Sequence, residues 1–116
     1  MTILIIDDSA SMRRMLREYL SRCSPGVVCV ECSAGEDALA AYERARPDWT
    51  FMDIKMGVLD GIAATKLIRN AFPDAKIAML TQYDDDDLRS DAIRAGAAGY
   101  FLKDNLREIE SILSQA

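Results

Sequence analysis

Four of the five apolar runs in the chain end at side chains that can take part in polar chemistry. The four exits are Asp7 and Asp8 after residues 3–6, Asp53 after 49–52, Thr81 after 77–80, and Lys103 after 100–102. Acids, a hydroxyl and a lysine are the groups that phosphoryl transfer to a carboxylate requires. The pattern therefore predicts a site where buried strands end, with Asp53 as the nucleophile and an aspartyl phosphate as the product.

Asp7, Asp8 and Asp53 are expected to meet at the carboxyl edge of adjacent strands. Carboxylates this close repel and raise one another's pKa unless a cation lies between them. Because the ligands are all oxygens and the chain has no histidine, the predicted cofactor is Mg²⁺ and not zinc. Lys103 would then bind a second anionic oxygen, and the Thr81 hydroxyl would donate to a third.

Each of these residues also has an ordinary structural explanation. Asp7 and Asp8 suit the N-terminus of a helix, where they interact with its dipole. Asp53 suits a turn, Thr81 the end of a strand, and Lys103 a solvated surface. We favour a site because four separate strand ends carry complementary groups. Without histidine no Ser/His/Asp set exists, and the sequence contains no nucleotide-binding glycine loop.

Size and charge limit the class of protein. The 116 residues predict one domain, residues 1–116, and half of them are apolar. The net charge of −5 disfavours direct nucleic-acid binding by this domain. No apolar run is long enough for a membrane span, and the N-terminus lacks the basic region of a secretory signal. A cytoplasmic location with no membrane contact is expected.

The three cysteines, Cys23, Cys29 and Cys32, include one C-x-x-C spacing. Residues three apart on a strand point to opposite faces, so Cys29 and Cys32 would not converge on a metal. We interpret all three as reduced core cysteines.

The order of the elements predicts an α/β fold. Strands are expected at residues 2–6, 27–30, 49–53, 76–80 and 99–102. Continuous apolar strands that alternate with amphipathic helices indicate a parallel sheet with helices on both faces.

The helices are read from their apolar spacing and their capping signals. The first should begin at Ser9 or Ser11 and bury a stripe that includes Met15 and Cys23. Residues 33–36 match a capping box for the second. The third should run from about Asp60 to Ala71 with Leu67 and Ala71 inward, the fourth from the acidic run at 84–87 to Ala95, and the last from about Asn105.

At these residues the chain resembles the receiver domain of two-component response regulators. The resemblance covers the whole chain and is specific in combination and order. It rests on Ile5-Ile6-Asp7-Asp8, Met52-Asp53-Ile54-Lys55-Met56 with Asp60-Gly61, Leu80-Thr81, and residues 96–103. It implies the flavodoxin-like (βα)5 fold, a five-stranded parallel sheet of order 2-1-3-4-5.

The resemblance also implies roles for single residues. Asp53 would accept a phosphoryl group from a phosphohistidine of a sensor kinase or histidine phosphotransfer protein. Asp8 and Asp53 would contact Mg²⁺ directly, Asp7 through water, and Lys55 through its backbone carbonyl. Thr81 and Tyr100 would move together as the switch.

Partners follow from the same resemblance. The fourth helix, fifth strand and fifth helix would signal to a downstream output domain or target protein, and the same face would serve a homodimer. Residues 96–104 are most similar to the branch that usually carries a helix-turn-helix output domain, so the chain is either a stand-alone receiver or one separated from that domain. Kinase docking near the first helix is also implied. Arg13 and Arg14 there equally fit exposed, solvated helix charges.

The chain departs from the family pattern near the predicted site. Gly57 replaces a usual proline and should loosen the loop after Asp53. Gln82 replaces a usual small residue and should narrow access to Asp53. Tyr83 should shield a phosphoryl group from water, so Lys55, Gln82 and Tyr83 are the predicted access residues.

Two other functions fit parts of the pattern. A Mg²⁺-dependent aspartate phosphohydrolase would use the same acids, but it would need a substrate-recognition cap, and the chain has no insertion for one. An interaction module with a vestigial site is disfavoured by the intact set of acids, threonine and lysine.

Overall fold

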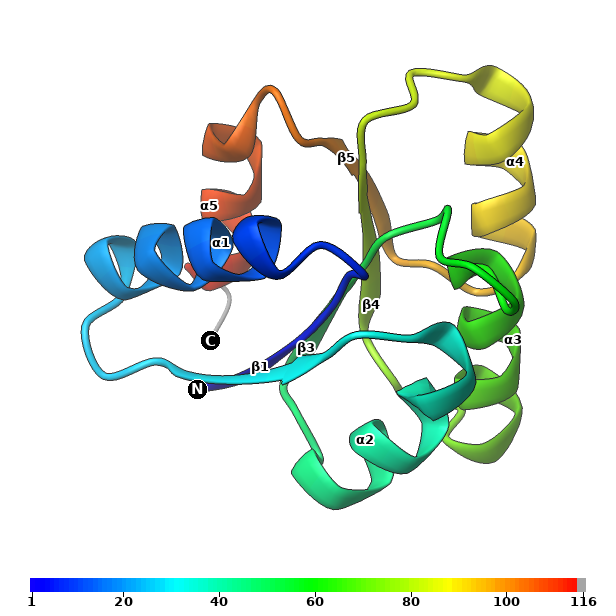
Figure 1. The fold of residues 1–116 in the computed structure, drawn as a ribbon, viewed down its shortest axis with the longest axis horizontal. Helices are drawn as coiled ribbons and strands as arrows, with labels where there is room; N and C mark the ends of the chain where they lie inside the picture. The colour runs from blue at the N-terminus through cyan, green and yellow to red at the C-terminus, as the bar shows by residue number, and fades with distance from the viewer. Residues whose placement is uncertain (115–116) are drawn as a thin grey trace.

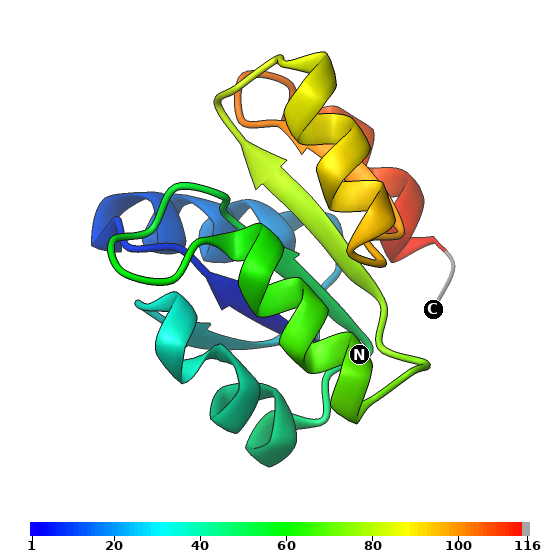
Figure 2. The ribbon, with the colours of Figure 1, turned by 90° about the vertical axis from the view of Figure 1, so that its right-hand side faces the viewer.

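The sheet sets the arrangement of the whole chain. A computed structural model describes residues 1–114. The strands are β1 (Thr2–Ile6), β2 (Val28–Cys32), β3 (Trp49–Met52), β4 (Ile77–Thr81) and β5 (Gly99–Leu102). They form one parallel sheet in the order β2-β1-β3-β4-β5. The predicted fold is confirmed, and the strand ends share one edge (Figure 2).

Helices cover both faces of this sheet. The α-helices are α1 (Ala10–Cys23), α2 (Ala38–Ala45), α3 (Gly61–Ala71), α4 (Asp86–Arg94) and α5 (Glu110–Leu113), and short 3₁₀ helices, η1 (Gly35–Asp37) and η2 (Leu106–Ile109), precede α2 and α5. Figure 1 shows α1 and α5 on one face and α2, α3 and α4 on the other.

The alternating side chains of the buried strands fill two cores. On β1, Ile3 and Ile5 pack in the core under α1 and α5, with Leu16. Leu4 and Ile6 pack in the other core, under α2, α3 and α4. Because both faces are covered, the strand must be apolar at every position, which explains its uninterrupted run of aliphatic residues.

Side chains cap three of the helices. Ser9 begins α1 and accepts from the Met12 amide at 3.2 Å, which decides between the two predicted serines. Asp60 caps α3 through the Ala63 amide at 2.8 Å, as predicted. Asp85, within the acidic run, caps α4 through the Leu88 amide at 2.9 Å. These side chains, one hydroxyl and two carboxylates, satisfy amides that have no partner within their helix.

The predicted capping box at residues 33–36 is wrong. Ala34 precedes η1, and no side chain caps that turn. A side-chain carbon on Gly35 would lie 2.0 Å from the carbonyl oxygen of Leu59. The close approach of the loop before α3 therefore fixes the backbone here, and the local capping signal does not.

Some predicted bounds and buried positions differ from the structure. The second strand is Val28–Cys32, so it includes Glu31. Met15 and Leu67 are each 46% exposed, and Cys23 and Ala71 are exposed as well. Cys23 and Ala71 are the last residues of α1 and α3, and Met15 and Leu67 face surface clefts.

The cysteines on β2 face opposite sides of the sheet, as predicted. Cys32 belongs to the core under α2, α3 and α4, and Cys29 packs against the core under α1 and α5. All three cysteines are free thiols, but Cys23 is exposed and does not belong to either core. None of the helices in residues 1–114 combines the length and apolar character needed to cross a bilayer.

Candidate functional site

Asp7 and Asp8 leave β1 at its carboxyl end. The Asp7 amide donates to the Cys32 carbonyl at 3.1 Å, and the Asp7 carboxylate accepts from the Ser9 amide at 2.9 Å. Asp7 is 4% exposed, whereas Asp8 is exposed to solvent. The first acid is therefore fixed by the end of the strand and by the turn into α1, and the second faces the open side.

Asp53 follows β3 directly and is 6% exposed. Its amide donates to the Ile6 carbonyl at 2.9 Å, which ties it to β1. Its Oδ1 accepts from the Ile54 amide at 2.9 Å. Gly61, the first residue of α3, lies against the Asp53 backbone so closely that a side-chain carbon there would be 1.9 Å from the Asp53 carbonyl oxygen.

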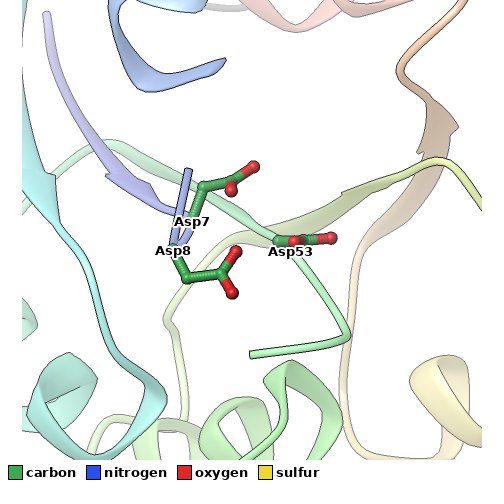
Figure 3. Close-up of side chains that lie close together, drawn as sticks. All are labelled: Asp7, Asp8 and Asp53. Carbon is green, nitrogen blue, oxygen red and sulfur yellow. The ribbon is translucent and has the colours of Figure 1, made fainter. Parts of the chain in front are cut away.

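The three carboxylates converge as predicted. One oxygen from each of Asp7, Asp8 and Asp53 lies within 4.8 Å of the other two, and Figure 3 shows the side chains meeting where β1 and β3 end. Burial raises the pKa of Asp53, and the charge of Asp7 raises it further, while Lys103 and the Ile54 amide oppose the shift. Asp53 is thus a carboxylate whose charge is costly to hold in this position.

Lys103 supplies a positive charge from the end of β5. Its Nζ lies 2.9 Å from Asp7 Oδ2 and 3.4 Å from Asp53 Oδ2. Burial lowers the pKa of Lys103, but the hydrogen bond to Asp7 and the charge of Asp53 outweigh it, so the net shift is upward. The ammonium therefore stays charged at neutral pH between two of the acids.

The donor set suits a hard divalent cation. Within residues 1–114 the cluster consists of carboxylates, with a lysine beside it. Oxygen-only ligands that leave positions for water and phosphoryl oxygens are typical of Mg²⁺ sites. Asp7 and Asp53 each give an oxygen to Lys103, and the carboxylate of Asp8 remains exposed toward the same point.

The two predicted switch residues lie behind the acids. Thr81 ends β4, is fully buried, and its hydroxyl accepts from the Tyr83 amide at 3.3 Å. The Tyr100 hydroxyl donates to the Tyr83 carbonyl at 2.6 Å. Burial raises the pKa of Tyr100, partly offset by Arg89, so its hydroxyl is a donor at neutral pH. Both residues therefore contact the same short segment after β4.

An open cleft of about 480 Å³ gives access to the acids. Lys55, Gln82 and Tyr83 line it, as the sequence predicts. The Lys55 Nζ lies 5.8 Å from the centre of the Tyr83 ring, within range of a cation–π interaction. The sequence reading missed four further lining residues from the start of α1: Ser9, Ser11, Met12 and Met15. Their only sequence signal is that they follow Asp8 within two helical turns.

The loop after Asp53 is anchored on both sides of Lys55. Ile54 and Met56 are 1% and 3% exposed, and Gly57 then turns the chain with φ = +57°. A proline, whose φ is fixed near −65°, cannot adopt this turn. The glycine is therefore matched to the turn that follows the anchored segment.

Comparison with known proteins gives one consistent family. Residues 3–114 match the family described as response regulator receiver domain. The uncharacterized transcriptional regulatory protein YxjL of Bacillus subtilis is 36% identical over 106 residues, or 91% of this chain and 49% of that protein. The chemotaxis protein CheY of Halobacterium salinarum is 37% identical, over 87% of this chain and 82% of that protein. The chain spans about half the length of the transcriptional regulators that it matches.

Solved structures agree with the fold. A LuxR-family two-component response regulator from Aurantimonas sp. SI85-9A1 has a TM-score of 0.88 and 30% identity, over 98% of this chain and 85% of that one. The signal receiver domain of a DNA-binding response regulator from Colwellia psychrerythraea 34H has a TM-score of 0.90 and 26% identity, over 98% and 95%.

Proposed function

The chain belongs to the response regulator receiver domain family, and on that premise we propose that Asp53 is the residue that accepts the phosphoryl group. The observation that carries this proposal is the convergence of Asp53 with Asp7 and Asp8, with the Lys103 ammonium 3.4 Å from its carboxylate. We further propose that residues 1–116 are one such domain and that it acts in the cytoplasm.

The donor is a phosphohistidine of a sensor kinase or histidine phosphotransfer protein. A carboxylate oxygen of Asp53 attacks phosphorus, the phosphorus–nitrogen bond breaks, and the imidazole leaves with the electron pair. Asp53 then holds an acyl phosphate. The ring nitrogen that carried the phosphoryl group takes one proton from solvent, which leaves the donor histidine as neutral imidazole. The domain in this proposal catalyses only its own phosphorylation and the later hydrolysis.

The proposed direct ligands of Mg²⁺ are Asp8, Asp53 and the Lys55 backbone carbonyl, and Asp7 would hold it through water. When bound, Mg²⁺ neutralises charge that builds up on the phosphoryl oxygens. Lys103 neutralises a second oxygen, because its ammonium already lies between Asp7 and Asp53. The Thr81 hydroxyl donates to a third oxygen through its O–H, while its oxygen is the acceptor for the Tyr83 amide.

The contact between Thr81 and Tyr83 connects the site to the switch. Tyr83 is held by the Thr81 hydroxyl through its amide and by the Tyr100 hydroxyl through its carbonyl. Movement of Thr81 toward a phosphoryl group therefore alters a segment that Tyr100 also holds. We propose that Thr81 and Tyr100 shift together and that α4, β5 and α5 pass the change to an output domain, a target protein or a second copy of the chain.

Access to Asp53 in this proposal is set by Lys55, Gln82 and Tyr83. All three line the cleft, and the Lys55 ammonium lies over the Tyr83 ring on the path to Asp53. Gln82 is exposed at the mouth, so it restricts small donors by its bulk. Tyr83 limits the approach of water to the acyl phosphate.

Intact mass after incubation with a phosphorylated histidine-kinase domain tests this function. We expect one added phosphoryl group in the presence of Mg²⁺ and none in EDTA. Asp53→Asn is the matched control, since it keeps the size of the side chain and loses the nucleophile. A phosphoryl group on Asp53→Asn, or one gained equally in EDTA, would contradict the assignment. If no kinase donor labels the wild type, labelling of Gln82→Ala would show that the site is closed by Gln82.

A further inference from the structure

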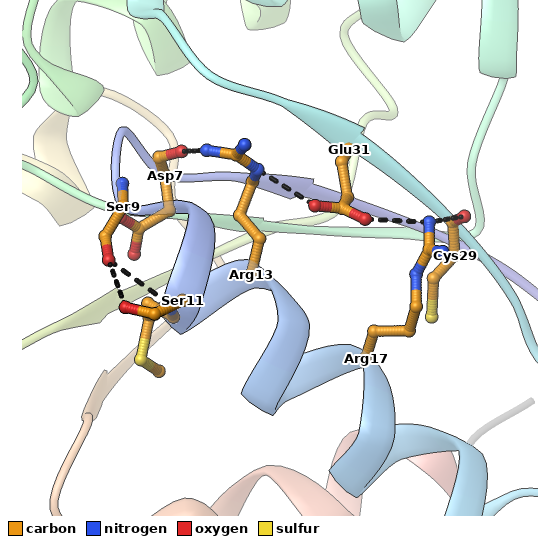
Figure 4. A network of polar contacts seen from close by, with 8 residues as sticks. Asp7, Ser9, Ser11, Arg13, Arg17, Cys29 and Glu31 are labelled. Carbon is orange, nitrogen blue, oxygen red and sulfur yellow. Dashed lines mark hydrogen bonds and ion pairs between the residues drawn. The ribbon is translucent and has the colours of Figure 1, made fainter.

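Arg13, in the first turns of α1, is bonded on two sides and is not a solvated surface charge. Its Nε donates to Glu31 Oε1 at 2.9 Å, and its NH1 donates to the backbone carbonyl of Asp7 at 2.7 Å. The Arg13 side chain is 16% exposed. Figure 4 shows the guanidinium lying between β2 and the turn that follows β1.

The bond to the Asp7 carbonyl also constrains the backbone of Asp8. The carbonyl of Asp7 and the amide of Asp8 belong to one planar peptide group, so fixing the carbonyl fixes the plane from which Asp8 begins. The other side of Asp7 is already fixed, because its amide donates to the Cys32 carbonyl at 3.1 Å. Arg13 therefore completes the backbone hold on the segment that carries both acids.

Resting on the function proposed above, we propose that Arg13 is a positioning residue for the acidic cluster. Through the Asp7 carbonyl it orients the exposed Asp8 so that its carboxylate faces Asp53. Asp8 needs such support more than its neighbours do. Asp7 is bound by the Ser9 amide and Lys103, and Asp53 by the Ile54 amide. Arg13 contacts the segment through the backbone and touches none of the three carboxylates.

Glu31 holds Arg13 in the required rotamer. Its second oxygen lies 2.9 Å from the Arg17 NH2, and Arg17 also donates to the Cys29 carbonyl at 3.2 Å. Glu31 therefore bridges two arginines of α1 to the edge strand β2. A forked guanidinium suits this place, because it can donate to a carboxylate and a carbonyl at the same time.

The direction of the change in Mg²⁺ affinity distinguishes a positioning role of Arg13 from the effect of its charge alone. A positive charge near a cation site repels Mg²⁺, so removal of Arg13 on electrostatic grounds alone would tighten Mg²⁺ binding. Removal of a positioning residue weakens it, by roughly 10- to 100-fold for groups that orient metal ligands. A role in stability alone would lower the unfolding midpoint and leave Mg²⁺ affinity unchanged.

The test is the Mg²⁺ dissociation constant of the full chain by calorimetry, with urea unfolding in EDTA measured alongside. We expect Arg13→Gln to weaken Mg²⁺ binding about tenfold. Arg17→Gln is the matched control, since it removes the same charge and an ion pair with the other oxygen of Glu31 without touching Asp7. It should bind Mg²⁺ at least as tightly as wild type. Arg13→Lys keeps the charge but lacks the guanidinium that donates to Glu31 and to the Asp7 carbonyl at the same time. This variant should bind Mg²⁺ more weakly than wild type.

Unchanged or tighter binding by Arg13→Gln would overturn the proposal, as would an equal loss in Arg17→Gln. If Arg13→Gln does not fold, wild-type affinity in Arg13→Lys overturns it instead. Measurements on the wild type distinguish a failure of this proposal from a failure of the proposed function. Wild-type protein that neither binds Mg²⁺ nor gains a phosphoryl group would end both proposals, whereas wild-type labelling with an unaffected Arg13→Gln would end only this one.

Discussion

Gly61 and Asp53 lie in backbone contact: a side-chain carbon on Gly61 would be 1.9 Å from the Asp53 carbonyl oxygen. The Gly61 amide also donates to the Ile54 carbonyl at 2.7 Å. The start of α3 therefore supports the peptide that carries the proposed phosphoacceptor, and only a residue without a side chain permits this approach.

Gly61→Ala should displace Asp53 or the start of α3. Because a shift of about 1 Å at a reacting group lowers rates by roughly 100-fold, we expect phosphoryl acceptance to slow by that order. Overpacking of this kind also lowers the free energy of unfolding by about 1–3 kcal/mol. Labelling rates and urea unfolding measure the two effects. Gly57→Asn is the control, since Gly57 has open space around it and asparagine tolerates its positive φ; a loss there as large as at Gly61 would rule out the contact as the cause.

Lys103→Met should have opposite effects on stability and on the response to Mg²⁺. Without the ammonium, Asp7 and Asp53 repel each other, so the metal-free protein should lose about 3 kcal/mol of unfolding free energy. Since Mg²⁺ then no longer competes with the lysine for these oxygens, added Mg²⁺ should raise the melting temperature of the variant more than that of wild type. Thermal melts with and without Mg²⁺ provide the comparison, and an equal Mg²⁺ shift in the two proteins would refute the shared-ligand explanation.

Asp53→Asn should stabilise the metal-free protein at neutral pH. The pKa of Asp53 in the folded state is raised, chiefly by burial and then by Asp7. Below the unfolded pKa, near 4, both states are protonated and the group costs nothing. As pH rises toward the folded pKa, the unfolded state ionises first, and wild type loses stability that asparagine retains.

The advantage of Asp53→Asn in EDTA should therefore grow with pH above about 4 and then level off once Asp53 is ionised in the folded state as well. Urea unfolding at several pH values measures it. Asp104→Asn, at an exposed position, is the control. A gain that shrinks as pH rises would have the wrong sign for this account.

Tyr100→Phe should loosen the segment after β4. It removes the hydroxyl that donates to the Tyr83 carbonyl at 2.6 Å but keeps the ring that Arg89 covers at 4.6 Å. The expected loss is about 1 kcal/mol, with faster amide hydrogen exchange across residues 82–85. Tyr19→Phe removes a hydroxyl that pairs with Glu110 instead, and it should leave exchange in that segment unchanged. Equal exchange rates in wild type and Tyr100→Phe would argue against the link.

The features that the sequence predicts correctly are those set by residues close together in the chain, namely the strand ends and the helix starts. Each buried strand is apolar on both faces, so strand ends are visible in the sequence, and parallel order then brings Asp7, Asp53 and Lys103 to one edge. Helix starts at Asp60 and Ser9 are also local, because a side chain three residues away satisfies the amide.

The features that sequence reasoning missed depend on tertiary contact. The capping box at 33–36 fails because Gly35 meets Leu59, a residue 24 positions further along the chain. The ion pair between Arg13 and Glu31 could not be read from the helical spacing of α1. It forms only because β2 lies beside β1 and under the helix. Leu67 and Met15 fit an inward helical spacing, but each is 46% exposed and lines a surface cleft.

The Asp7–Lys103 ion pair joins the first strand of the chain to the last. During synthesis, Asp7, Asp8 and Asp53 emerge before Lys103 does, because they lie earlier in the chain. The pair forms only after β5 has emerged and paired with β4, which happens late because domains are made from the N-terminus. The positive charge of the site therefore comes from the end of the last strand, so Lys103 neutralises the acidic cluster only in a chain whose sheet is complete.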